Sequence, residues 1–172
     1  KYINTKNLPG LGDDFYKFEK TFGLPIVTDT SNSSWTWAEY SVEDMQLDII
    51  VGSKGKTGRA DMVVIRTPGY TIKNDQQIMS LIKAFGGVYK NDPLSNPNRS
   101  VRYLPSGRLE FGLSQAKNYR CAFFPPASSQ NNTYEVVVTR LPGNVLNILR
   151  NEVREAKLLK FLQPVAGLAD NQ

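Results

Sequence analysis

The chain of 172 residues contains no histidine, and this absence excludes more chemistry than any other feature of the sequence. Histidine is the commonest general base and metal ligand, and it is part of every Ser-His or Cys-His nucleophile pair. An enzyme would have to use paired carboxylates in a cleft, a lysine or a borrowed cofactor. Metal-ligand spacings and nucleotide-binding loops are also lacking. We therefore expect no catalytic residues, no metal site and no bound cofactor.

Other absences define the general class of the protein. Cys121 is the only cysteine, so no internal disulfide can form, and we expect a buried, unreactive thiol. No apolar run approaches the roughly 18 residues of a membrane helix, so no transmembrane segment is expected. The hydrophobic content of 40% and the charged content of 22% are typical of a globular domain.

The beginning of the chain suggests where the protein works. The sequence starts at Lys1 without a methionine, so we expect that an upstream segment was removed. The polar opening KYINTKN is consistent with a tether between an anchor and a folded body. This favours a location outside the cytoplasm or tethered to a membrane, with a cytoplasmic location as the alternative.

Two stretches of the sequence resemble each other. RADMVVIRTPG, residues 59–69, returns 74 positions later as TYEVVVTRLPG, residues 133–143. Two helical patterns also match, and both end in Lys-x-Phe-Gly, in which Phe22 and Phe85 are predicted to be equivalent core residues. We therefore predict that one α/β unit occurs twice. The predicted parts, which form one compact domain, are a tether at residues 1–11, a first repeat at 12–69, a second repeat at 70–143 and a C-terminal helix and tail at 144–172.

The helices are predicted from apolar spacing and capping residues. Residues 12–23 form the first helix, with Asp13 as its cap, and residues 74–87 form the second, opened by a capping box of Asn74 and Gln77. Alternating apolar residues predict strands. They are expected at residues 34–40, 45–52, 59–67, 99–103, 108–114, 119–124 and 133–141.

These elements predict an α+β fold. Each repeat is a helix followed by a three- to four-stranded antiparallel meander. The meanders join into one continuous sheet with the helices on one face, and a C-terminal helix follows. This tandem layout is similar, in topology only, to the repeats of secreted protein-inhibitor and lipoprotein domains and to the saddle of the TATA-binding protein. The resemblance carries over no site residue.

Aromatic residues form the first candidate binding site. Trp35 and Trp37 share one face of a strand, Tyr40 is nearby, and Tyr103 and Tyr119 extend the group from the second repeat. Large aromatic residues on a strand are more often core than site, and burial is the favoured interpretation. On a helix-free face they would instead form a flat platform for a base, a sugar or the apolar anchor of a partner.

A glycine-rich hairpin forms the second candidate. GSKGKTGR, residues 52–59, contains Lys54, Lys56 and Arg59, called the basic tip below, without a compensating acid nearby in the sequence. Its Gly-Lys-Thr is not a phosphate-binding loop, because Ile50 occupies the place of the first glycine and a strand follows instead of a helix. A structural hairpin is the favoured interpretation, and contact with an anionic partner is the alternative.

Three classes of function remain. The leading hypothesis is a non-catalytic binding or scaffold domain, located outside the cytoplasm, that presents an open sheet face to an unidentified protein or polymer. The second is a nucleic-acid-binding domain, supported by the net charge of +5 and by aromatic residues interleaved with Arg and Lys. The third, an enzyme, would need a carboxylate pair in a cleft.

Overall fold

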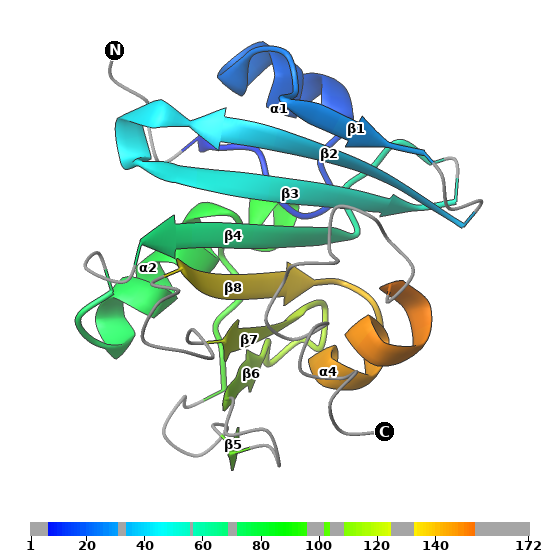
Figure 1. The fold of residues 1–172 in the computed structure, drawn as a ribbon. Helices are drawn as coiled ribbons and strands as arrows, with labels where there is room; N and C mark the ends of the chain where they lie inside the picture. Colours follow the sequence, from blue (N-terminus) through cyan, green and yellow to red (C-terminus); the bar gives the residue numbers. More distant parts are fainter. Residues whose placement is uncertain are drawn as a thin grey trace.

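The computed structural model describes residues 7–30, 34–55, 57–68, 72–95, 102–103, 109–124 and 133–153. Its centre is one antiparallel sheet of eight strands in the order β1-β2-β3-β4-β8-β7-β6-β5 (Figure 1). The predicted α+β class and the single antiparallel sheet are therefore confirmed. Within the described ranges, no helix is long and apolar enough to cross a membrane.

Each half of the chain has a helix followed by four strands, but the 3-10 turns lie at different places in the two halves. The first half contains α1 (Phe15–Phe22), β1 (Val27–Asp29), β2 (Trp35–Val42), the 3-10 turn η2 (Glu43–Met45), β3 (Leu47–Lys54) and β4 (Met62–Pro68). The second half contains α2 (Asp75–Ala84), the 3-10 turn η4 (Gly87–Tyr89), β5 (Arg102–Tyr103), β6 (Leu109–Leu113), β7 (Arg120–Phe124) and β8 (Thr133–Thr139). The last strands of the two halves, β4 and β8, pair at the centre of the sheet. Superposition of the two halves stays a prediction.

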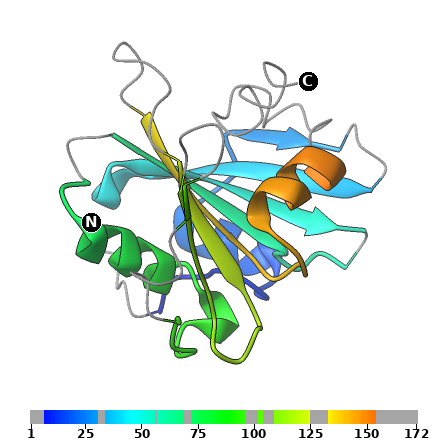
Figure 2. The same cartoon turned by 90° about the horizontal axis from the view of Figure 1, so that it is seen from below.

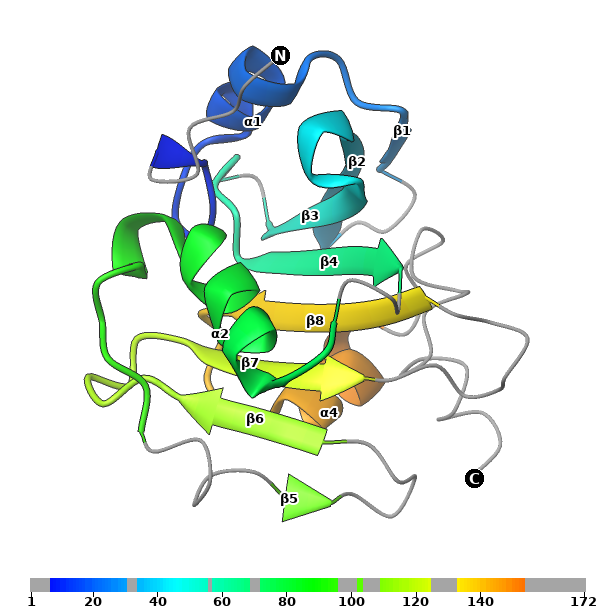
Figure 3. The same ribbon diagram turned by 90° about the vertical axis from the view of Figure 1, so that its left-hand side faces the viewer.

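The expectation that all helices lie on one face of the sheet is wrong. α1 and α2 pack on one face, where they share a core with Tyr40 and Ile49. α4 (Val145–Ile148) and the π-helical turn η5 (Leu149–Val153) pack on the opposite face (Figures 2 and 3). The central strands carry apolar side chains on both faces, so both faces have to be covered.

The first described residues belong to the core and not to a tether. Leu8 and Leu11 are buried, so residues 8–11 are part of the folded body. The backbone of this segment runs against the end of α2, where the N–H of Leu11 donates to the carbonyl of Phe85 at 3.2 Å. A Cβ atom on Gly10 would lie 2.1 Å from that carbonyl oxygen, so only glycine fits there.

The predicted caps are confirmed for the second helix only. Asn74 Oδ1 accepts a hydrogen bond from the N–H of Gln77 at 3.1 Å, as a capping box requires. At the first helix the N-cap is Asp14, whose side chain makes no capping hydrogen bond. Asp13 instead accepts from the N–H of Gly10 at 2.9 Å, because the chain turns back on itself just before the helix.

The two phenylalanines that end the helices differ in burial. Phe85 is completely buried, as predicted. Phe22 is half-buried and packs at the edge of the same core, against the ring of Tyr40 at a centroid distance of 6.3 Å. The two residues are therefore not equivalent anchors, because α1 lies over β2, near the open edge of the sheet, whereas α2 contacts the central strand β8.

Candidate functional site

Trp35 and Trp37 form part of the core, which excludes them from a surface platform. Their rings stack at a centroid distance of 4.9 Å, and both are buried beneath α4 and η5. Gly52 lies opposite Trp37 in the neighbouring strand, and the indole ring occupies the space where a Cβ atom would lie. The favoured interpretation of these tryptophans as core residues is confirmed, and the alternative of a helix-free aromatic face is wrong.

Tyr40 and Tyr119 are also buried, on the face covered by α1 and α2. Tyr40 stacks on Phe18, and burial, followed by the nearby charge of Glu19, raises the pKa of its phenol. The hydroxyl of Tyr119 donates to the backbone carbonyl of Asp92 at 3.2 Å. Burial is the main cause that raises the pKa of Tyr119 to about 12. Neither phenol is available to a partner at the surface.

Two candidate residues cannot be placed as side chains. Tyr103 belongs to β5, of which only the backbone is described, and Lys56 of the basic tip lies outside the described residues.

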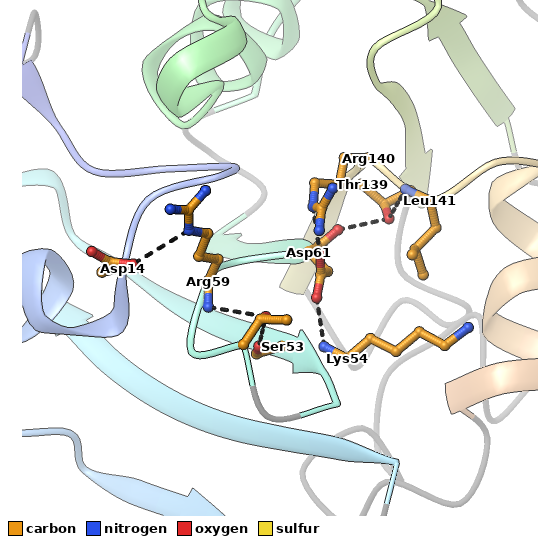
Figure 4. A network of polar contacts seen from close by, with 9 residues as sticks. Asp14, Ser53, Lys54, Arg59, Asp61, Thr139, Arg140 and Leu141 are labelled. Atoms are coloured by element: carbon orange, nitrogen blue, oxygen red, sulfur yellow. Dashed lines mark hydrogen bonds and ion pairs between the residues drawn. The ribbon is translucent and has the colours of Figure 1, made fainter.

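The basic tip belongs to a structural hairpin between β3 and β4, which was the favoured interpretation. The expectation that its basic side chains have no acid partner is wrong for Lys54 and Arg59. Nζ of Lys54 lies 2.9 Å from a carboxylate oxygen of Glu152 in η5. Nε of Arg59 lies 3.8 Å from a carboxylate oxygen of Asp14, just before α1 (Figure 4). Both acids are distant in sequence, and folding brings them to the hairpin. These ion pairs weaken the case for a phosphate-binding surface.

A buried polar network at the base of this hairpin was not predicted from the sequence. The carboxylate of Asp61, only 2% exposed, lies 2.5 Å from Nε of Arg140 and accepts a hydrogen bond from the N–H of Lys54 at 2.6 Å (Figure 4). The carbonyl of Asp61 accepts from the hydroxyl of Thr139 at 2.9 Å. This network joins the start of β4 to the end of β8 and therefore connects the two halves of the chain. Arg140, which begins the Arg-Leu-Pro-Gly at the end of the second similar stretch, therefore has a structural role.

An apolar groove of about 650 Å³ lies beside α2 and is called the α2 groove below. Figure 3 shows α2 lying in front of the central strands. Apolar side chains from η2, β3 and α2 contribute Met45, Leu47, Leu81 and Ala84, together with Ile72 before the helix. The polar residues that line it are Thr67, Gln77, Ser80, Lys83, Lys90 and Asn91. The set contains no carboxylate.

A second, polar hollow of about 460 Å³ lies at the same end of β3 and β4 as the α2 groove and shares Leu47 and Thr67 with it. Asp48 and Glu135 face Arg66 from the two neighbouring strands. Burial raises the pKa of the nearby Glu39, with the Arg66 charge lowering it and the Asp48 charge raising it. The arginine thus lies between the two acids in the strand register. Within the described parts of the chain, no three His, Cys, Asp or Glu side chains gather as metal ligands do.

Comparison with known proteins identifies no family. No family model and no curated protein matches the chain. A cysteine-rich secretory protein from Staphylococcus aureus is 12% identical over 75% of this chain and 42% of its own, with a TM-score of 0.39. An extracellular protein containing an SCP domain from Bacillus anthracis is 14% identical over 87% of this chain and 50% of its own, with a TM-score of 0.42.

The chain spans half or less of the length of these two solved structures. Both TM-scores are below 0.5, so these likenesses establish neither a shared fold nor a shared activity. The α2 groove, described from the chain's own residues, is the strongest candidate for a functional site.

Proposed function

We propose that the protein is a non-catalytic binding domain that works outside the cytoplasm and holds an apolar ligand in the α2 groove. The supporting observation is the groove itself. Its volume of about 650 Å³ falls within the range of roughly 300 to 1,000 Å³ typical of ligand sites. Most of the surface of its lining is apolar, as in such sites, although six of its eleven lining residues carry polar side chains.

The groove replaces the sheet face as the proposed binding surface. Four of the five aromatic candidates, Trp35, Trp37, Tyr40 and Tyr119, lie beneath α4 or beneath the helices of the other face. Leu81 and Ala84, by contrast, are only half-buried and line the groove from α2. An apolar surface of this kind gains free energy when a ligand removes it from water.

A binding role fits this lining better than catalysis does. None of the described residues that line the groove is a carboxylate, and the whole chain has no histidine, so the usual general bases are missing from this lining. The location outside the cytoplasm is part of this proposal. Fractionation of cells that produce the full-length protein tests it, and recovery in the cytoplasmic fraction would refute it.

The groove is tested with the neutral apolar dye N-phenyl-1-naphthylamine, whose fluorescence rises when it leaves water. We expect the parent protein to bind the dye and an Ala84→Phe variant to bind it at least about tenfold more weakly, because the new ring fills the groove and removes roughly 1.4 kcal/mol or more of binding free energy. Gln76→Phe is the matched control, since Gln76 lies on the same helix and does not line the groove. Equal binding by the two variants would refute the proposal.

A further inference from the structure

We propose that the ligand of the α2 groove is a single-chain amphiphile with an anionic head group, its alkyl chain on the apolar floor and its head group beside Lys83 and Lys90. This inference rests on the proposed function and names the class of ligand for the same site.

The first support is the charge of the lining. Lys83 and Lys90 line the groove at the end of α2 and just after η4, and no acid is among the described residues that line it. The other polar residues of the rim, such as Gln77, Ser80 and Asn91, are neutral hydrogen-bonding groups. The charged side chains of this lining are thus both cations, which favours an anionic ligand over a cationic one.

The second support is the state of the carbonyl groups at the end of α2. The C-terminal end of a helix carries partial negative charge on its free carbonyls and would favour a cationic head group. Here the carbonyl of Leu81 accepts from the N–H of Phe85 at 3.1 Å, and that of Lys83 accepts from the N–H of Gly86 at 3.3 Å. Two of the carbonyls at this end of the helix are therefore already hydrogen-bonded, which weakens their attraction for a cationic head group.

The third support favours an alkyl chain over an extended peptide. An extended peptide binds best along a free strand edge, where it completes the hydrogen bonds of the backbone. The strands that contribute to the groove, β3 and β4, are interior strands with paired neighbours on both sides. The floor thus provides apolar side chains without a backbone edge, and an alkyl chain needs no hydrogen bonds.

The experiment compares three ligands with the same chain, namely decanoate, decanol and decyltrimethylammonium. Each displaces N-phenyl-1-naphthylamine from the parent protein at concentrations below micelle formation. We expect decanoate to bind most tightly, decanol less tightly and the cation most weakly. In a Lys83→Gln, Lys90→Gln variant, decanoate should lose about 3- to 30-fold in affinity, since two partly exposed ion pairs are removed, and decanol should be unchanged.

The matched control is a Lys54→Gln, Arg59→Gln variant, which loses the same net charge at the hairpin between β3 and β4. Lys54 lies at the opposite end of β3 from Leu47 of the groove, roughly 23 Å away at about 3.3 Å per residue, which is well beyond the Debye length of about 8 to 10 Å. This variant should therefore bind all three ligands within about twofold of the parent. Equal affinity for decanoate and decanol, or an equal loss in the control variant, would overturn the inference while leaving an apolar groove in place. Failure of all three ligands to displace the dye would overturn the proposed function as well.

Discussion

Replacing Arg140 with Ala should destabilise the fold more than replacing its partner Asp61 with Ala, although both changes break the same ion pair. The carboxylate of Asp61 is 2% exposed, whereas the side chain of Arg140 is 38% exposed. Without Asp61, the guanidinium group can turn toward water. Without Arg140, the carboxylate keeps its buried position and its hydrogen bond from the N–H of Lys54, but it loses its countercharge.

The magnitudes follow from this difference in exposure. Leaving a buried charge without its partner costs about 3 to 5 kcal/mol, so Arg140→Ala should lie in this range. Asp61→Ala breaks charge-assisted hydrogen bonds but leaves only hydratable groups, and we expect a loss of about 1.5 to 3 kcal/mol. The double variant removes the orphaned carboxylate. It should therefore be more stable than Arg140→Ala alone.

Urea unfolding followed by tryptophan fluorescence measures these free energies, since Trp35 and Trp37 are buried and report on the folded state. Arg59→Ala is the control, because both partners of the Arg59 and Asp14 pair are about two-thirds exposed, at 66% and 65%. It should change the free energy of unfolding by less than about 1 kcal/mol. The reasoning is refuted if Asp61→Ala costs as much as Arg140→Ala, or if the double variant is the least stable of the three.

Three further predictions follow from burial and charge. Phe85→Ala should lower the free energy of unfolding by about 3 to 5 kcal/mol, because Phe85 is completely buried. Phe22→Ala should lower it by at least about 1 kcal/mol less, because Phe22 is half-exposed. Equal losses would contradict this difference in burial. The pKa of Tyr119 is raised to about 12, so its contribution to stability is full below about pH 10, the ordinary value for an unfolded tyrosine, and is lost as the pH rises toward 12. Tyrosinate absorbance should show this late ionisation, and a Tyr119→Phe variant should lose less stability over the same interval. Replacing all three residues of the basic tip by Ala should leave any binding to duplex DNA unchanged, whereas a fall of the salt slope by up to roughly 3 would revive the nucleic-acid hypothesis.

Most of the fold could be predicted because dense apolar alternation marks the long strands. β2, β3, β4 and β8 occur close to where the alternation places them. β1 was missed, since three residues at the edge of a sheet give too short a pattern to recognise. Alternation also shows which side chains share a face, but not what covers that face. The position of α4 opposite α1 and α2 could therefore be found only from the structure.

The candidate sites were harder to predict because they depend on register. Asp61 and Arg140 are 79 residues apart in sequence, and only the pairing of β4 with β8 brings them together. The α2 groove likewise combines Met45 of η2 with residues of α2. The periodicity of α2 predicts an apolar stripe, yet nothing in that pattern shows that part of the stripe stays open.

The two similar stretches of the sequence form β4 and β8, which pair with each other at the centre of the sheet. The Val-Val centres of the two stretches lie directly opposite each other, as Val63 with Val138 and Val64 with Val137. When two similar strands pair antiparallel about their centres, equivalent residues of the two strands lie at opposite ends of the paired segment. These two similar stretches therefore form the strand pairing that joins the two halves of the chain.

This pairing predicts a second ion pair between the strands. Arg66 lies 74 positions before Arg140, and Glu135 lies 74 positions after Asp61, so Arg66 and Glu135 are the counterparts of Arg140 and Asp61. Arg66 faces Glu135 in the register of β4 and β8, and Glu135 is buried. Arg66→Glu and Glu135→Arg should each be destabilising, because each places like charges directly opposite one another across the strands. The charge-exchanged double variant restores opposite charges between positions 66 and 135, although Asp48 then faces a glutamate, and it should be more stable than Arg66→Glu by at least about 1 kcal/mol in urea unfolding. A double variant no more stable than Arg66→Glu would show that the two side chains do not interact and that β4 and β8 share one ion pair, not two.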